Sequence, residues 1–192
     1  MKLDENKLLE RAKHGNERAF EGLVRLYEAR VFSYAMTLLG NRQDAEEVTQ
    51  DVFVKIWRTL ARFRGDCSFS SWVMRITKNT ATDALRARRE PTVSLTAEDE
   101  NGEEREMDLV DEDPASNPSA AFERDERIKL VRRAIGELPH DQREILTLRD
   151  LYGYRYEEIA HILQLEDGTV RSRLNRARQH LKKILESWNF SP

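Results

Sequence analysis

Guanidinium, amide and hydroxyl side chains follow one face of segment 169–185, which contains no acidic residue. This polar face consists of Arg171, Ser172, Asn175, Arg176, Arg178, Gln179 and Lys183. On the other side, Val170, Leu174, Ala177, Leu181 and Ile184 recur with the period of one buried helical stripe. Because arginine, asparagine, glutamine and serine form hydrogen bonds with base edges, the pattern predicts a helix that binds duplex DNA.

A shorter helix is expected just before it, over about 155–163. Its inward positions are Ile159, Ala160 and Leu163. Glu166-Asp167-Gly168 separates the two helices, with Asp167 and Thr169 as candidate N-caps. The pattern is that of a helix-turn-helix, which places its second helix in the major groove. The alternative is an ordinary surface helix with a solvated charged face. The uniform positive charge, the small Ala160 and the break at Gly168 favour DNA binding.

A second place with suitable chemistry is a predicted loop and the helix after it. The segment ARFRGDCSFS at 61–70 breaks the helical pattern at Gly65 and retains Phe63, Arg64 and Phe69. The helix expected over 71–89 carries a basic and polar row at Arg75, Asn79, Thr82, Arg86 and Arg89. Aromatic faces stack on unpaired bases, at about 1–3 kcal/mol each, while cations follow the backbone, so this combination suits single-stranded DNA. The alternative is that Phe63, Phe69 and Trp72 are core residues.

Further periodic segments predict the helices that must position these two sites. Segment 16–39 is a core helix whose apolar stripe is Phe20, Leu23, Tyr27, Val31, Tyr34 and Leu38. Segment 44–60 buries Ala45, Val48, Val52, Ile56 and Leu60. Its outward face, Glu46, Glu47, Gln50, Asp51, Val54 and Lys55, is either solvated or a docking surface for another protein. Helices over 122–138 and 141–152 are expected to pack over the helix-turn-helix to form a four-helix lobe.

The charge distribution divides the 192-residue chain. Its formal net charge is −3. Residues 97–113 contain ten acidic residues and one basic residue, Arg105, so this segment has a net charge of −9 and the rest of the chain has a net charge of +6. Segment 91–121 also contains Pro91, Pro114 and Pro118 and reads as a linker. We therefore expect an all-α protein of two small helical domains, 1–90 and 122–192, joined by an acidic linker over 91–121.

Several classes of function are excluded on composition. The single Cys67 allows no internal disulfide, and four scattered histidines give no metal-ligand spacing. Nothing resembles a nucleophile with its base or a glycine loop for phosphate, so we expect no enzyme, cofactor or small-molecule substrate. The longest uncharged run, 31–41, is far short of the ~20 residues of a membrane span, which predicts a cytoplasmic protein.

Four blocks of sequence, in this order, carry a resemblance to a known family. They are AFEGLVRLYEARVFSYAMTLLGN at 19–41, DAEEVTQDVFVKIWR at 44–58, FSSWVMRITKNTATDALR at 69–86 and LPHDQREILTLRDLYGYRYEEIAHILQLEDGTVRSRLNRAR at 138–178. In these blocks the chain resembles the bacterial extracytoplasmic-function (ECF) sigma factors of the sigma-70 superfamily, subunits that direct RNA polymerase to promoters. The ordered set is specific, although each block alone is weak.

The resemblance implies roles for both domains. Domain 1–90 would be sigma region 2, whose outward face docks on the clamp helices of the polymerase largest subunit through Glu47, Gln50, Asp51 and Val54. The loop and helix that follow would hold the minus 10 element, with its extruded base and non-template single strand, through Phe63, Arg64, Asp66, Ser68, Phe69, Arg75, Lys78, Asn79, Thr82 and Arg86. Domain 122–192 would be sigma region 4 and would read the duplex minus 35 element through Arg171, Ser172, Asn175, Arg176, Arg178 and Gln179.

The resemblance also implies core RNA polymerase as a partner and control by an anti-sigma factor that clamps between the two domains. The acidic linker either threads through the polymerase or is a plain tether, and Cys67 is either a redox handle or a small filler. The first rival hypothesis is a stand-alone helix-turn-helix regulator; the second is a protein-interaction module. The sequence does not indicate the promoter, the regulon, the inducing signal or the identity of an anti-sigma factor.

Overall fold

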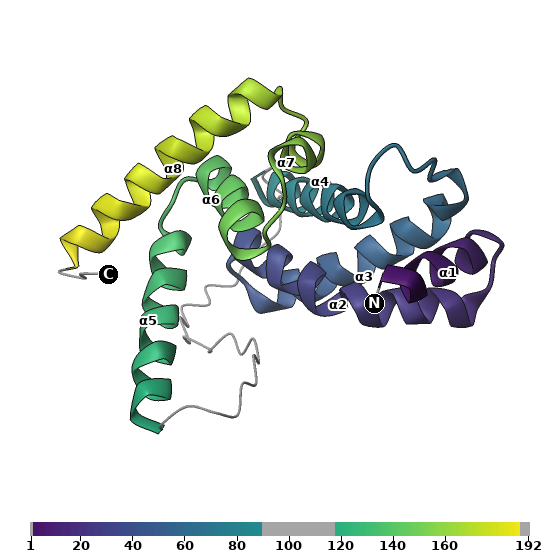
Figure 1. The fold of residues 1–192 in the computed structure, drawn as a ribbon, viewed down its shortest axis with the longest axis horizontal. Helices are drawn as coiled ribbons and strands as arrows, with labels where there is room; N and C mark the ends of the chain where they lie inside the picture. Colours follow the sequence, from purple (N-terminus) through teal and green to yellow (C-terminus); the bar gives the residue numbers. More distant parts are fainter. Residues whose placement is uncertain (1, 90–117, 189–192) are drawn as a thin grey trace, which may run out of the picture.

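The computed structural model describes residues 2–89 and 118–188, and within these ranges every element is a helix (Figure 1). The expected all-α class is confirmed. The elements are α1 (Lys2–Lys13), α2 (Glu17–Leu39), α3 (Arg42–Thr59), the 3-10 turn η1 (Leu60–Arg62), α4 (Phe69–Arg89), α5 (Pro118–Gly136), α6 (His140–Leu146), the π-helical turn η2 (Thr147–Leu151), α7 (Tyr156–Leu163) and α8 (Asp167–Ser187).

Helix α2 is the centre of the N-terminal lobe, which we define as α1 to α4. Its predicted apolar stripe is buried except for the half-buried Phe20. The side chain of Asn16 caps its start by accepting from the Ala19 amide at 2.9 Å. Gly40 ends it with φ 71°, a left-handed conformation that favours glycine. Helix α1, which the sequence reasoning did not predict, packs on α2 at Gly22, where a Cβ would lie 3.0 Å from Leu8.

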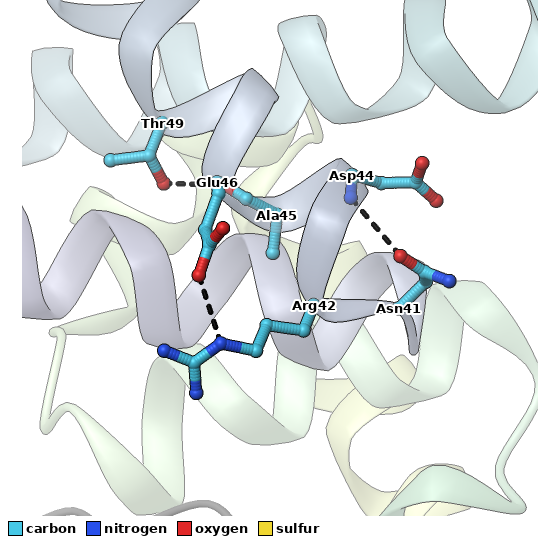
Figure 2. Close-up of polar contacts among 6 residues, drawn as sticks. All are labelled: Asn41, Arg42, Asp44, Ala45, Glu46 and Thr49. Carbon is cyan, nitrogen blue, oxygen red and sulfur yellow. Dashed lines mark hydrogen bonds and ion pairs between the residues drawn. The ribbon is translucent and has the colours of Figure 1, made fainter. Parts of the chain in front are cut away.

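Helix α3 turns back along α2 from a capped corner (Figure 2). The Asn41 side chain accepts from the Asp44 amide at 3.1 Å, and Arg42 Nε donates to Glu46 Oε1 at 2.8 Å. One turn on, Thr49 Oγ1 donates to the Ala45 carbonyl at 2.6 Å, so the hydroxyl of this buried residue is satisfied. The predicted buried row of segment 44–60 is confirmed: Ala45, Val48, Val52 and Ile56 of α3 and Leu60 at the start of η1 are all buried.

The C-terminal lobe, α5 to α8, contains the expected helix-turn-helix as α7 and α8. Helix α8 packs on α6, α7 and α5. The second expected helix continues through η2, where the Tyr152 amide donates to the Thr147 carbonyl at 3.1 Å, a π-type turn that was not predicted. Helix α5 begins at Pro118, inside the predicted linker 91–121, so helix starts earlier than expected. The acidic run 97–113 lies outside the described residues.

The two lobes are in contact, with α7 lying on α4 and α6 on α2 (Figure 1). Their buried apolar side chains form one continuous cluster. Among residues 2–89 and 118–188, no helix is both long enough and apolar enough to cross a membrane. The same described residues contain no group of three or more side chains suited to a metal ion.

Candidate nucleic-acid interface

The polar face of α8 is exposed as the sequence predicts. Arg171, Ser172, Asn175, Arg176, Arg178, Gln179 and Lys183 are all exposed, whereas Val170, Leu174 and Ala177 are buried beneath them. The predicted N-caps were wrong. Helix α8 begins at Asp167 with Glu166 as its N-cap residue, and the Thr169 amide already donates to the Glu166 carbonyl at 2.9 Å. Ser172 Oγ donates to the Thr169 carbonyl at 3.0 Å.

Arg178 differs from the other predicted minus 35 residues because it is held by a carboxylate of its own lobe. Its Nε donates to Asp150 Oδ2 at 3.0 Å, and its Nη2 is paired with Asp150 Oδ1. These hydrogen bonds raise the pKa of Arg178. The pair joins α8 to η2, so in this structure Arg178 positions the helix. A contact between Arg178 and DNA stays a prediction.

The aromatic residues of the predicted minus 10 loop form a cluster with each other. Phe69 is only 6% exposed, and its ring meets the edge of Tyr27 with centroids 5.4 Å apart. Phe63 lies 5.6 Å from Phe69 and 5.0 Å from Trp72, centroid to centroid, and Lys13 Nζ is 5.3 Å from the Phe63 ring. Phe69 and Trp72 are therefore core residues in this conformation. Half-buried Phe63 retains more exposed surface than either of them.

The polar row on α4 is divided by the C-terminal lobe. Asn79 and Arg86 are exposed, as are Arg64, Asp66 and Ser68 in the loop. Arg75 and Lys78 are half-buried on the side toward α6 and α7. Arg75 Nη1 lies 3.1 Å from His161 Nε2, and burial, followed by the charge of Arg75, lowers the pKa of His161. Thr82 is half-buried and donates its hydroxyl to the Lys78 carbonyl at 2.8 Å.

The outward face of α3 remains open to solvent. Glu47, Gln50, Asp51 and Val54 are all exposed, and Val54 is 47% exposed. Trp57, 38% exposed and packed 4.8 Å from the Phe20 ring, lies one turn further along the same face. Sequence reasoning missed Trp57, although its spacing of three from Val54 is a signal that could have found it. An exposed apolar pair with charged neighbours of both signs, here Asp51, Lys55 and Arg58, suits a protein-docking surface.

A groove of about 650 Å³ runs between α1, the 63–70 loop and the turn before α7. Charged residues of both signs line it: Glu5, Glu10, Lys13, Arg30, Arg64 and Glu158. Cys67 also lines this groove and is half-buried. Burial raises the pKa of the Cys67 thiol, which disfavours the reactive thiolate. This favours the interpretation of Cys67 as a filler.

Comparison with known families matches both lobes. The Sigma-70 region 2 family matches residues 23–90, and the Sigma-70, region 4 family matches residues 128–181. The RNA polymerase sigma-H factor of Pseudomonas aeruginosa is 40% identical over 184 residues, covering 95% of this chain and 94% of the relative. The ECF RNA polymerase sigma-E factor of Escherichia coli K12 is 38% identical over 179 residues, covering 92% of each.

Solved structures share the fold. CnrH, in complex with the cytosolic domain of CnrY, superposes with a TM-score of 0.68 at 27% identity, covering 96% of this chain and 98% of that chain. The sigma factor RpoE of Bartonella quintana, in complex with the anti-sigma factor NepR, has a TM-score of 0.62 at 23% identity, covering 87% and 96%. The chain therefore belongs to the ECF sigma factors of the sigma-70 family.

Proposed function

We propose that this ECF sigma factor gives core RNA polymerase its promoter specificity through three separate surfaces. These are the exposed face of α8 for the minus 35 element, the 63–70 loop with α4 for the minus 10 element, and the outward face of α3 for the polymerase. The main observation behind the proposal concerns helix α8. Its exposed face carries basic and amide side chains, and its opposite face is apolar and packs on the lobe. Sigma factors are initiation factors rather than enzymes, and the proposal requires no catalysis or cofactor.

The α8 surface supplies groups for both kinds of DNA contact. Arg171, Ser172, Asn175 and Arg176 lie in the first three turns, the part of a recognition helix that reaches base edges. Arginine pairs with guanine and asparagine with adenine in the major groove, which gives base discrimination. Gln179 and Lys183 lie further along the helix and suit contacts to the DNA backbone.

The loop and α4 suit a melted strand. Arg64 is exposed next to Phe63 of the aromatic cluster, and Asn79 and Arg86 are exposed further along α4, so polar and cationic groups follow the loop and the helix. Capturing unstacked bases offsets the few kcal/mol that it costs to flip each base out of the duplex. Phe63 is the aromatic residue of this loop best placed to offer a partly exposed ring.

The α3 surface suits polymerase docking because it combines exposed apolar and acidic side chains. Val54 and Trp57 offer apolar area, with Glu47 and Asp51 beside them. We further propose that the two domains act in the cytoplasm and are joined by a linker that ends where α5 begins, at Pro118. The complexes of CnrH with CnrY and of RpoE with NepR support control of this chain by an anti-sigma factor as well.

In vitro transcription with core polymerase and a library of genomic fragments from the source bacterium tests this function. We expect the chain to start discrete transcripts that core enzyme alone does not make. Aligning their upstream sequences should give two shared elements, one near minus 35 and one near minus 10. A chain that fails to bind core polymerase, or that starts no transcript from any fragment, contradicts the proposal.

A further inference from the structure

The last residue of α1 lies over the aromatic cluster of the 63–70 loop. Lys13 Nζ is 5.3 Å from the centroid of the Phe63 ring, a cation–π contact. The Lys13 side chain is 22% exposed, and its ammonium is also paired with Glu10 Oε1 at 3.0 Å. Of the two phenylalanines in this loop, Phe63 is the less buried. The chain therefore holds a cation against the loop ring that retains the more exposed surface.

The backbone that carries Lys13 is fixed beside the loop. Leu9 and Ala12 of α1 are buried, and the helix packs on α2. Helix α1 also contacts η1, which leads directly into the 63–70 loop. Just after Lys13, the Gly15 amide donates to the Ala12 carbonyl at 2.9 Å and closes the end of the helix. The helix is held in place, whereas the four-carbon side chain of Lys13 keeps its freedom to turn.

Two fixed rings and one flexible cation lie against Phe63. Trp72 is tilted by 41° at a centroid distance of 5.0 Å, and Phe69 meets the ring at 74° and 5.6 Å. Both of these rings are buried in the core of the lobe. Lys13 takes up ring surface that they leave open. A base that stacks on Phe63 must therefore take the place of the Lys13 ammonium.

The groove between α1 and the 63–70 loop gives such a base room. Its volume of about 650 Å³ lies within the range of roughly 300–1,000 Å³ in which pockets hold small organic groups. Phe63 and Arg64 line it from the loop, and Glu5, Glu10 and Lys13 line it from α1. Of the described α1 residues in this wall, Lys13 alone is cationic. It is the side chain with which α1 attracts a phosphate.

Moving the ammonium away from the ring costs little. Base stacking on an aromatic ring is typically stronger than a lysine–aromatic contact that water reaches. The pair with Glu10 is weak as well, because the Glu10 side chain is 65% exposed. A stacked base brings the phosphates of its strand to the groove, within range of a cation on a flexible stem. The ammonium thus exchanges two weak contacts for a phosphate.

We propose that Lys13 is a further contact for the non-template strand of the minus 10 element. Without DNA, its ammonium occupies the open surface of Phe63. The extruded base takes this surface, and the ammonium then binds a phosphate of the same strand. The contacts of Lys13 with Phe63 and Glu10 follow from the structure alone, whereas the exchange with a base rests on the proposed function. Helix α1 thereby forms one wall of the minus 10 site.

The salt dependence of strand binding tests the phosphate contact. Holoenzyme is formed from core polymerase and the full-length chain, and the probe is the single-stranded non-template minus 10 segment of a promoter identified by transcription. For a single strand, each neutralised phosphate contributes about 0.7 to the slope of log K against log salt. Lys13→Met keeps an apolar side chain and removes the charge, so the slope should become less steep by about 0.7. Between about 50 and 200 mM salt, its affinity should fall about 2.6-fold less than that of the wild type.

Two variants serve as controls. Lys13→Arg should keep the wild-type slope, because arginine retains both the charge and the contact with the ring. Lys7→Met, at an exposed position of α1 that does not line the groove, should also keep it. Loosening of the loop alone would weaken binding by the same factor at every salt concentration. A slope for Lys13→Met equal to that of the wild type therefore overturns the contact.

An abasic nucleotide in the probe then tests the exchange. Placing it at each position in turn identifies the extruded base as the one whose removal weakens binding most. Without that base the ammonium stays on Phe63, so wild type and Lys13→Met should show the same slope. A difference of about 0.7 that persists with the abasic probe overturns the exchange. If core polymerase and the chain make no transcripts at all, the proposed function itself fails, whereas unchanged slopes with an active holoenzyme refute only the role of Lys13.

Discussion

The buried carboxyl of Glu144 makes the stability of this protein depend on pH. Glu144 is 6% exposed, with Tyr34 of α2 and Lys78 of α4 close enough to interact electrostatically. Burial, partly opposed by Lys78 and Arg173, raises its pKa from 4.5 to about 7. The folded chain therefore binds this proton more tightly than the unfolded chain. The proton on Glu144 therefore stabilises the folded state. This contribution is fully present below pH 4.5 and is lost as pH rises through 7.

The size of the effect follows from the shift. A rise of the pKa from 4.5 to about 7 corresponds to roughly 3 kcal/mol, of which about 2 kcal/mol falls between pH 5 and pH 8. Glu144→Gln removes the titrating group and retains a similar shape. The free energy of unfolding of Glu144→Gln minus that of the wild type should therefore be about 2 kcal/mol larger at pH 8 than at pH 5, because only the wild type loses stability as pH rises.

Urea unfolding followed by circular dichroism at pH 5 and pH 8 measures this difference. Comparing the two proteins at each pH cancels the other titrating groups. Glu137→Gln, at an exposed position near the same helix, serves as the control and should track the wild type. Equal pH dependence in wild type and Glu144→Gln would show that the folded state leaves this carboxyl with its ordinary pKa, and would refute the reasoning.

Four further predictions concern the proposed surfaces and the ion pair that positions α8. Arg176→Ala should weaken binding to the minus 35 element by about 1–3 kcal/mol and relax base preference there, measured by competition of holoenzyme with variant promoters; unchanged binding counts against the role of α8. Arg178→Ala and Asp150→Ala should each lower the free energy of unfolding by about 0.5–1 kcal/mol, a small loss because the pair is half-exposed. In a double-mutant cycle the two losses should be strongly coupled, since either substitution removes the same ion pair. Additive losses would show that the pair does not anchor α8. Asn79→Ala should reduce permanganate reactivity of melted thymines, and unchanged reactivity argues against its role. Val54→Glu should weaken core binding without changing the melting temperature, which pull-down and thermal unfolding would check.

The periodic parts of the fold could be predicted because burial leaves a period in the sequence. The apolar rows of α2, α3 and α8 were predicted correctly except that Phe20, Leu181 and Ile184 are only half-buried, since each row places apolar residues every three or four positions over several turns. Helix α1 was missed because charged residues dominate it, and within residues 5–13 only Leu9 and Ala12 are buried. The π-turn η2 was missed because the amphipathic pattern runs through it without a break.

The arrangement of the sites depended on contacts that no local pattern encodes. Arg178 pairs with Asp150 across 28 positions of sequence, so its role in positioning α8 was not visible. The bond from Ser68 to Glu158 joins residues 90 positions apart, and both are polar. The sequence therefore predicted two helical lobes and the exposed polar face of α8, but not that one lobe packs on the other. Phe69 fell between two interpretations because an aromatic residue that stacks on a base and one that fills a core have the same spacing.

Footprinting of an identified promoter with and without core polymerase tests the central claim most directly. The chain should protect DNA near minus 35 and near minus 10 together, and only when core polymerase is present. Arg176→Ala should weaken the upstream protection first. If the chain alone protected the same duplex with the same affinity, or if core polymerase added neither protection nor transcripts, the sigma-factor account would be contradicted.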